Sequence, residues 1–174
     1  MQINVLNVLS QPAASWASPI DMLYACHGKV KRFSRQLQIL PEYLRNHGVN
    51  QVVKNDVQMI LNYFNRAAQL HHQDEEQNFF PTLSQYAPEA QERIDLLESQ
   101  HAIFGELWAQ LAAQLEELIA EQRSEVDEQL ILQFTNGYAK HIELEEPLFE
   151  LGKQHIPEAE LTLIGEQMFA RRQR

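Results

Sequence analysis

Four stretches of this sequence place apolar side chains at spacings of three and four residues, and each stretch carries one histidine on its apolar stripe. This spacing brings side chains to one face of an α-helix. The four histidines are His27, His71, His101 and His141. An imidazole on the core-facing side of every long helix restricts the fold strongly, because each buried polar group needs a partner inside the core.

Proline, glycine and acidic residues mark where the helices should begin and end. We expect the first helix to start at Ser18, with Pro19 in its first turn, and to run to about residue 40. Pro41 should interrupt this helix, and a short continuation should stop at Gly48. Further helices are expected over about residues 50–80, 88–122, 124–152 and 157–171.

Short connections between long helices favour antiparallel neighbours. The sequence therefore predicts an all-α fold, an antiparallel up-down-up-down four-helix bundle over residues 18–153. An extended N-terminal arm over residues 1–17 and a fifth, C-terminal helix over 157–171 should complete it. A chain of 174 residues is long enough for one core, so we expect a single domain over 1–174.

The charge balance excludes several classes of partner. Lys and Arg number 14 against 24 Asp and Glu, for a net charge of −10. A chain this acidic, with no basic stripe, lacks the electrostatic footprint for nucleic acid or an anionic membrane surface. No apolar run approaches the ~20 residues needed to cross a bilayer. Cys26 is the only cysteine and no basic leader precedes the first helix, so we expect a cytoplasmic protein.

The four histidines are also expected at one level along the bundle. His27 lies about 21 residues before the turn at Gly48, and His71 lies about 23 residues after it. The same count gives about 16 and 14 residues around the next turn, and about 22 and 18 around the third. At ~1.5 Å per residue, the four imidazoles converge within one or two helical turns. Chance placement would scatter them along the bundle axis.

Two of the helices add a glutamate four residues after the histidine. The pairs are His71 with Glu75 and His141 with Glu145. Residues at this spacing project from the same helix face, one turn apart. A carboxylate that points into a core costs several kcal/mol unless it is paired or binds a metal. No inward lysine or arginine is available, so the pattern predicts a metal site.

The size of the ligand set indicates two metal ions. The predicted ligands are His27, His71, Glu75, His101, His141 and Glu145. Six ligands exceed the four of a tetrahedral zinc site, and mixed imidazole and carboxylate ligands suit iron, manganese or zinc. Two carboxylates can bridge two metals that each take two imidazoles, with a water-derived oxygen completing the bridge. Each metal then keeps an open position for a small molecule such as dioxygen.

Two other interpretations of these residues remain open from the pattern alone. His72 and Glu76 form a second pair at the same spacing, one residue out of phase with the apolar stripe. They would then replace His71 and Glu75 as ligands, or flank them. The polar residues would otherwise form a metal-free hydrogen-bonded network in the core. Tyr138, one turn before His141, is placed either to hydrogen-bond an imidazole or to serve as ordinary core.

Four short motifs together resemble the hemerythrin-like family, the HHE cation-binding domain, over roughly residues 20–170. The motifs are Ala25-Cys26-His27, His71-x-x-x-Glu75-Glu76 running into Phe79-Phe80-Pro81, Ser99-Gln100-His101, and His141-Ile142-Glu143-Leu144-Glu145-Glu146 running into Leu148-Phe149. The resemblance implies a non-haem site with two iron ions, bridged by oxo and carboxylate groups. It also favours His71 and Glu75 as ligands, since Glu75 stands six residues before Pro81 as in the family motif.

The sequence departs from two branches of that family. Oxygen-carrying hemerythrins of invertebrates have a second histidine on the third helix, where this chain has Gly105. The set of four histidines and two glutamates is similar to the branch that repairs iron centres. That branch carries an additional N-terminal domain with a cysteine pair, which this sequence lacks.

We therefore expect a protein that binds dioxygen, a related small oxidant or nitric oxide for storage, sensing or detoxification, rather than an enzyme. One alternative is a di-iron enzyme of the peroxidase type, or a protein that delivers or repairs iron centres. Another is a regulatory module that responds to metal or oxygen. The sequence makes no prediction of oligomeric state.

Overall fold

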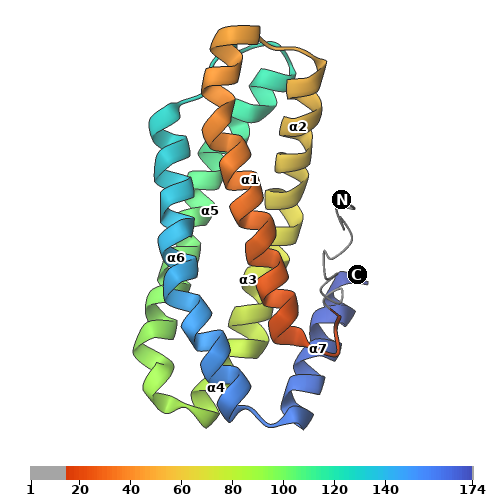
Figure 1. The fold of residues 1–174 in the computed structure, drawn as a ribbon, viewed down its shortest axis with the longest axis vertical. Coiled ribbons are helices and arrows are strands. Elements are labelled where there is room, and N and C mark those ends of the chain that lie inside the picture. Colours follow the sequence, from red (N-terminus) through yellow and green to blue (C-terminus); the bar gives the residue numbers. More distant parts are fainter. Residues whose placement is uncertain (1–14, 174) are drawn as a thin grey trace, which may run out of the picture.

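The computed structural model describes residues 15–173, and its regular elements over that range are all helical. Figure 1 shows long helical stretches lying side by side along the longest axis of the molecule. The predicted all-α class and helical bundle are confirmed. The predicted N-terminal arm falls almost entirely outside the described residues.

Helix α1 (Pro19–His47) begins where the sequence predicted, with Pro19 in its first turn. Ser18 precedes it, but the Ser18 side chain makes no capping hydrogen bond. The helix ends at Gly48, whose φ of +65° is a conformation that glycine adopts at little cost.

The expected interruption of α1 at Pro41 was wrong, since the helix is continuous through this residue. Proline removes one intrahelical hydrogen bond. Leu37, Leu40 and Leu44 are buried in the core on both sides of Pro41, and Pro41 is buried with them. This packing outweighs the lost bond.

The second long stretch is one continuous helix built from alternating segments, and we call it the composite helix. Its segments are α2 (Gln51–Asn62), the π-helical η1 (Tyr63–Ala67), α3 (Ala68–Asp74), the π-helical η2 (Glu75–Phe79) and α4 (Phe80–Tyr86). The predicted end before Pro81 was wrong. Pro81 lies in the first turn of α4, directly after the π-helical η2, and proline is tolerated at such a position.

The remaining long helices are α5 (Gln91–Ile119), α6 (Glu128–His155) and α7 (Glu158–Arg172). A short 3₁₀ turn, η3 (Pro88–Ala90), directly precedes α5. Helix α6 begins four residues later than expected, because Asp127 caps it by accepting hydrogen bonds from the backbone N–H groups of Gln129 and Leu130. It continues past Gly152 to His155.

Helix α6 packs against both α1 and α5, and α5 packs against α2. The connections from α1 to α2 and from α5 to α6 lie at the top of Figure 1, and those that follow α4 and α6 lie at the bottom. Helix α7 lies outside the four long stretches and contacts α1, α3 and η2. None of the helices described within residues 15–173 is long and apolar enough to span a membrane.

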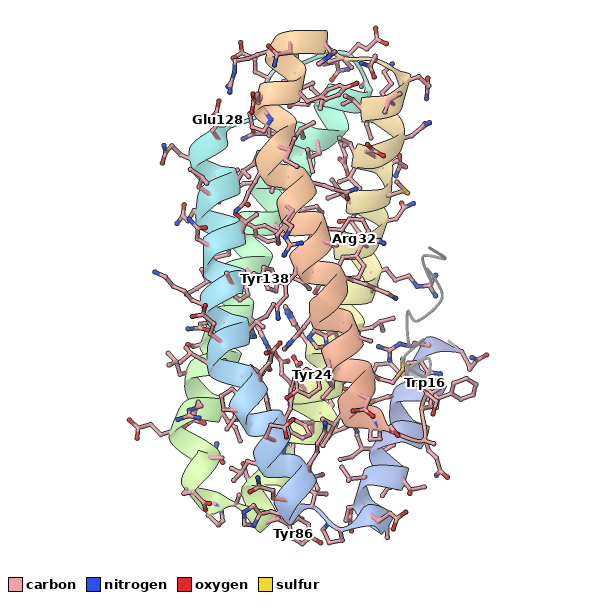
Figure 2. The ribbon with its side chains drawn as sticks, viewed as in Figure 1. Trp16, Tyr24, Arg32, Tyr86, Glu128 and Tyr138 are labelled. Carbon is pink, nitrogen blue, oxygen red and sulfur yellow. The ribbon has the colours of Figure 1, made fainter. Side chains whose placement is uncertain are left out.

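Two apolar cores occupy the bundle, one on each side of a buried polar layer. Phe64, Leu111 and Phe134 belong to the first core, whereas Phe79 and Phe149 belong to the second. The polar layer comprises His27, His71, His72, Asp74, Glu75, His101, His141 and Glu145, all of them buried. On each of the four long stretches these residues separate the members of one core from the members of the other. Figure 2 shows the side chains that fill the bundle along its length.

Candidate metal centre

All six residues predicted as metal ligands meet in the polar layer. His27 comes from α1, His71 from α3, Glu75 from η2, His101 from α5, and His141 and Glu145 from α6. None of the six is more than 6% exposed. They converge because the histidines of consecutive helices lie at similar distances on the two sides of the turn that joins those helices.

Four of these residues form a first group of potential ligands. His27, His71, Glu75 and Glu145 each offer one ligand atom, and these atoms lie within 4.8 Å of one another. Nε2 of His27 is 2.9 Å from Oε2 of Glu145. Nε2 of His71 is 3.0 Å from Oε1 of Glu75. Two imidazole nitrogens and two carboxylates therefore surround one point.

A second group lies beside the first and shares Glu145 with it. The ligand atoms of His101, His141 and Glu145 also lie within 4.8 Å of one another. Nε2 of His101 is 3.2 Å from Nε2 of His141, which is 3.4 Å from Oε2 of Glu145. Oε2 of Glu75 lies 3.6 Å from Nε2 of His101. Both glutamates thus stand between the two pairs of histidines.

Several buried polar atoms at this place have no hydrogen-bond partner among residues 15–173. They are both carboxyl oxygens of Glu75, Oε1 of Glu145 and Nδ1 of His71. Unpartnered buried acceptors are rare and costly in native proteins, and a cation supplies the missing partner. The donor set of four imidazoles and two carboxylates fits two cations that take nitrogen and oxygen ligands.

Outer hydrogen bonds orient three of the imidazoles. Nδ1 of His101 lies 2.7 Å from Glu76, Nδ1 of His141 lies 2.8 Å from Gln100, and Nδ1 of His27 lies 3.3 Å from Glu146. With a metal bound, an acceptor at Nδ1 would favour the tautomer whose Nε2 lone pair faces the centre. Sequence reasoning did not assign this role to Gln100 or Glu146. Each of the three acceptors directly adjoins a predicted ligand in the sequence, and this adjacency is the signal that identifies them.

His72 lies at the edge of the polar layer and outside both groups of converging atoms. Its ring stacks on that of His101 with centroids 3.8 Å apart, and its Nε2 is 3.2 Å from the hydroxyl of Tyr138, with which it hydrogen-bonds. Glu76 binds the outer nitrogen of His101 and does not reach the centre. The geometry therefore favours His71 and Glu75 over the alternative pair. Figure 2 labels Tyr138, which α6 contributes to the bundle interior.

Burial and neighbouring charges set the protonation of the cluster. Burial lowers the pKa of His71, His72 and His141 and so favours the neutral form of each imidazole. Burial, together with the charge of Glu145, raises the pKa of Glu75 well above its ordinary value. Burial also acts to raise the pKa of Glu145, but the neighbouring imidazoles of His141 and His27 hold that pKa well below its usual range. A cation held by these residues would favour the deprotonated form of the Glu75 carboxyl.

The two glutamates reach the centre from different local backbones. Glu145 follows His141 within the regular α-helix α6, whereas Glu75 is the first residue of the π-helical η2. A π turn inserts an additional residue into the helical repeat and re-aims the side chains around it, and such turns are frequent at functional sites. The identical spacing of the two pairs contains no signal for this difference.

A helical bundle with a buried cluster of imidazoles and carboxylates defines a metal-binding protein. The model of the Hemerythrin HHE cation binding domain matches residues 18–151 of this chain. The chain belongs to this family, which confirms the resemblance inferred from the sequence motifs. It is also 58% identical over 163 residues to a Haemophilus influenzae protein that is described only as uncharacterized. That match covers 94% of this chain and 95% of the relative.

Proposed function

We propose that this protein is a non-haem di-iron protein that binds dioxygen, a related small oxidant or nitric oxide, for storage, sensing or detoxification. The four long helical stretches would form an antiparallel up-down-up-down bundle around the centre. The observation that carries the proposal is the position of Glu145, which belongs to both groups of converging ligand atoms while each group retains two imidazoles of its own. A shared carboxylate between two histidine pairs is an arrangement for two metals.

The distances suggest a role for each ligand. We assign His27 and His71 to one iron and His101 and His141 to the other, with Glu75 and Glu145 as bridging carboxylates. Support for this assignment comes from Glu75, whose two oxygens contact different histidines, and from Glu145, whose Oε2 contacts His27 and His141. Iron is favoured over zinc or manganese by the family resemblance, and the mixed ligand set is compatible with it.

Bound iron would supply redox chemistry and an open coordination position for a small ligand. The chain supplies the surroundings. Phe149 stacks on the His27 ring with centroids 5.0 Å apart, and Phe104 meets the His141 ring edge to face at 5.2 Å. Because these rings and the burial of all six predicted ligands exclude bulk water, a small, weakly polar ligand fits the centre better than a large substrate.

Metal analysis and an optical spectrum of the protein purified in air test the metal assignment. We expect about two irons per chain with charge-transfer bands in the near ultraviolet. A single zinc, or metal well below one ion per chain, would contradict the proposal. His101→Ala should lower the iron content, whereas His47→Ala should leave it unchanged, because His47 is exposed at the end of α1, where its Nδ1 lies 3.3 Å from the Tyr43 carbonyl oxygen.

Titration of the reduced protein with dioxygen or nitric oxide under anaerobic conditions tests the ligand assignment. Saturation of the spectral change at a fixed ratio of ligand to iron pairs would support binding. Consumption of many equivalents per centre would instead support a di-iron enzyme.

We also propose a cytoplasmic location, which is supported by a composition in which Cys26 is the only cysteine.

A further inference from the structure

Asp74 is a fully buried carboxylate that the metal centre does not use. It directly precedes Glu75, is 0% exposed and belongs to neither group of converging ligand atoms. Its partners come from α7. Arg172 makes a two-pronged contact with it, Nη2 to Oδ2 at 2.6 Å and Nη1 to Oδ1 at 3.1 Å. Arg171 also donates to Oδ1. Paired guanidinium groups of this kind stabilise a charged carboxylate in a buried position.

The contacts of α7 continue along η2. Arg171 donates hydrogen bonds to Gln77 at 3.0 Å and to the side-chain oxygen of Asn78 at 2.7 Å. The Asn78 amide donates in turn to Gln167 of α7. Helix α7 therefore holds the π turn at three positions, which are residue 74 before it and residues 77 and 78 within it.

Arg172 is itself held in place by the chain around it. Its guanidinium donates to the Met168 carbonyl at 2.8 Å and lies 4.7 Å from the centre of the Trp16 ring. The Trp16 ring also lies 6.0 Å from that of Phe169. Figure 2 shows Trp16 beside α7. The arginine therefore reaches Asp74 from a fixed position, which preserves the geometry of its two contacts.

We infer that Arg171 and Arg172 are positioning residues of the metal centre, and this inference rests on the proposed function. A π turn is less favourable than a regular α turn and persists where tertiary contacts stabilise it. The two arginines stabilise the η2 turn through Asp74 and Asn78, and the turn aims the two oxygens of Glu75 at His71 and His101. We refer to these contacts between α7 and the π turn as the arginine clamp. Loss of the clamp releases Glu75 while the apolar cores remain packed.

Hydrogen exchange on the metal-free full-length chain tests the first half of this inference. The Arg171→Gln/Arg172→Gln variant should exchange the backbone amides of residues 74–79 at least tenfold faster than the unmodified chain, with little change over residues 138–149 of α6. Arg45→Gln is the matched control, because Arg45 pairs with Glu128 on the exposed surface, away from the polar layer. Equal acceleration in all helices would indicate a merely structural role and would overturn the inference.

Iron retention tests the second half. The double variant should release iron to a chelator at least tenfold faster than the unmodified chain, and iron should raise its melting temperature by a smaller increment. A merely structural role would lower the melting temperatures of the metal-free and iron-loaded forms equally, leaving that increment unchanged. Unchanged iron release would also overturn the inference.

A lysine pair separates positioning from charge compensation. Arg171→Lys/Arg172→Lys keeps both positive charges but loses the planar fork that contacts Asp74 at two points. We expect this variant to fold and still to lose iron faster than the unmodified chain. Retention equal to that of the unmodified chain would show that charge alone suffices and would refute the positioning role. If the unmodified chain binds no iron, the proposed function fails, while the hydrogen-exchange experiment still decides whether α7 holds the π turn.

Discussion

Two helices of this bundle carry the same His-x-x-x-Glu spacing, yet they present their glutamates differently. On α6, His141 and Glu145 lie on one regular α-helix, and Oε2 of Glu145 contacts both His141 and His27. On the composite helix, Glu75 opens a π turn and divides its two oxygens between His71 and His101. The spacing selects which residues face the core, whereas the backbone around them selects which atoms meet.

The neighbours of the two pairs differ in the same way. His72 follows His71, whereas the apolar Ile142 follows His141. Asp74 precedes Glu75 in a buried, clamped position, whereas the residue before Glu145 is an exposed leucine. The composite helix therefore buries two more ionisable groups than α6 does. We therefore expect the conformation of the composite helix to depend more strongly than that of α6 on pH and on contacts from outside the four long helical stretches.

The largest effect should come from removing one glutamate at a time. Glu145→Ala should reduce the iron content from about two ions to almost none, because this residue belongs to both groups of converging atoms. Glu75→Ala should retain about one, held by His101, His141 and Glu145. Metal analysis after loading under identical conditions measures this difference, with circular dichroism to verify that both variants are folded. Equal losses would show that the two glutamates are equivalent after all.

A smaller effect should appear in the stability of the metal-free protein at acidic pH. Because burial lowers the pKa of His71, His72 and His141, the unfolded chain binds more protons at these three groups than the folded chain does as the pH falls below about 6.5. Glu75 opposes this, since its raised pKa lets the folded chain hold one proton that the unfolded chain releases. The free energy of unfolding should therefore fall by on the order of 2 kcal/mol per pH unit between about pH 6.5 and 5.

Denaturant unfolding of the metal-free protein at several pH values measures this slope. His72→Gln should reduce the slope by about 1 kcal/mol per pH unit, because it removes one of the three protons while keeping a polar group near Tyr138. His155→Gln is the control, since His155 is exposed at the end of α6. A slope that His72→Gln leaves unchanged would mean that this ring is already protonated in the folded protein.

The smallest effect concerns the contact between α6 and the π turn. A Cβ at Gly152 would lie 2.7 and 2.9 Å from two atoms of the Phe79 ring, the last residue of η2. Gly152→Ala should lower the free energy of unfolding by about 1 kcal/mol, because overpacking of ~1–3 kcal/mol exceeds the helix propensity gained.

Gly105→Ala provides the matched comparison for this substitution. In the part of the chain that the structure describes, no neighbouring atom lies within 4 Å of the added Cβ, and Gly105 lies on the exposed face of α5. This variant should raise the free energy of unfolding by about 0.5–1 kcal/mol. Thermal or denaturant unfolding of both variants measures whether each substitution lowers or raises the free energy of unfolding. Stabilisation by both substitutions would show that Phe79 moves aside at little cost.

The sequence by itself determined which residues face the core and at what depth. Apolar periodicity placed His27, His71, His101 and His141 on inward stripes, and distances from the turns placed them at one level. Both are local properties, since the helical repeat and the rise per residue hold for any regular α-helix. For this reason the six candidate ligands were identified without structural information, and the structure brings all six together.

Only the tertiary structure decided where helices continue and how the glutamates are aimed. The helix persists through Pro41 because its neighbours are buried against other helices, and the composite helix continues past Pro81 after a π turn. The arginine clamp joins residues 74 and 172, which lie far apart in the sequence. Such features depend on contacts between distant segments, whose energies exceed the local preferences that a sequence pattern expresses. The sequence therefore predicted how many histidines face the core and that they lie at one depth along the bundle. It did not predict that the carboxyl oxygens of Glu75 and Glu145 contact different sets of histidines.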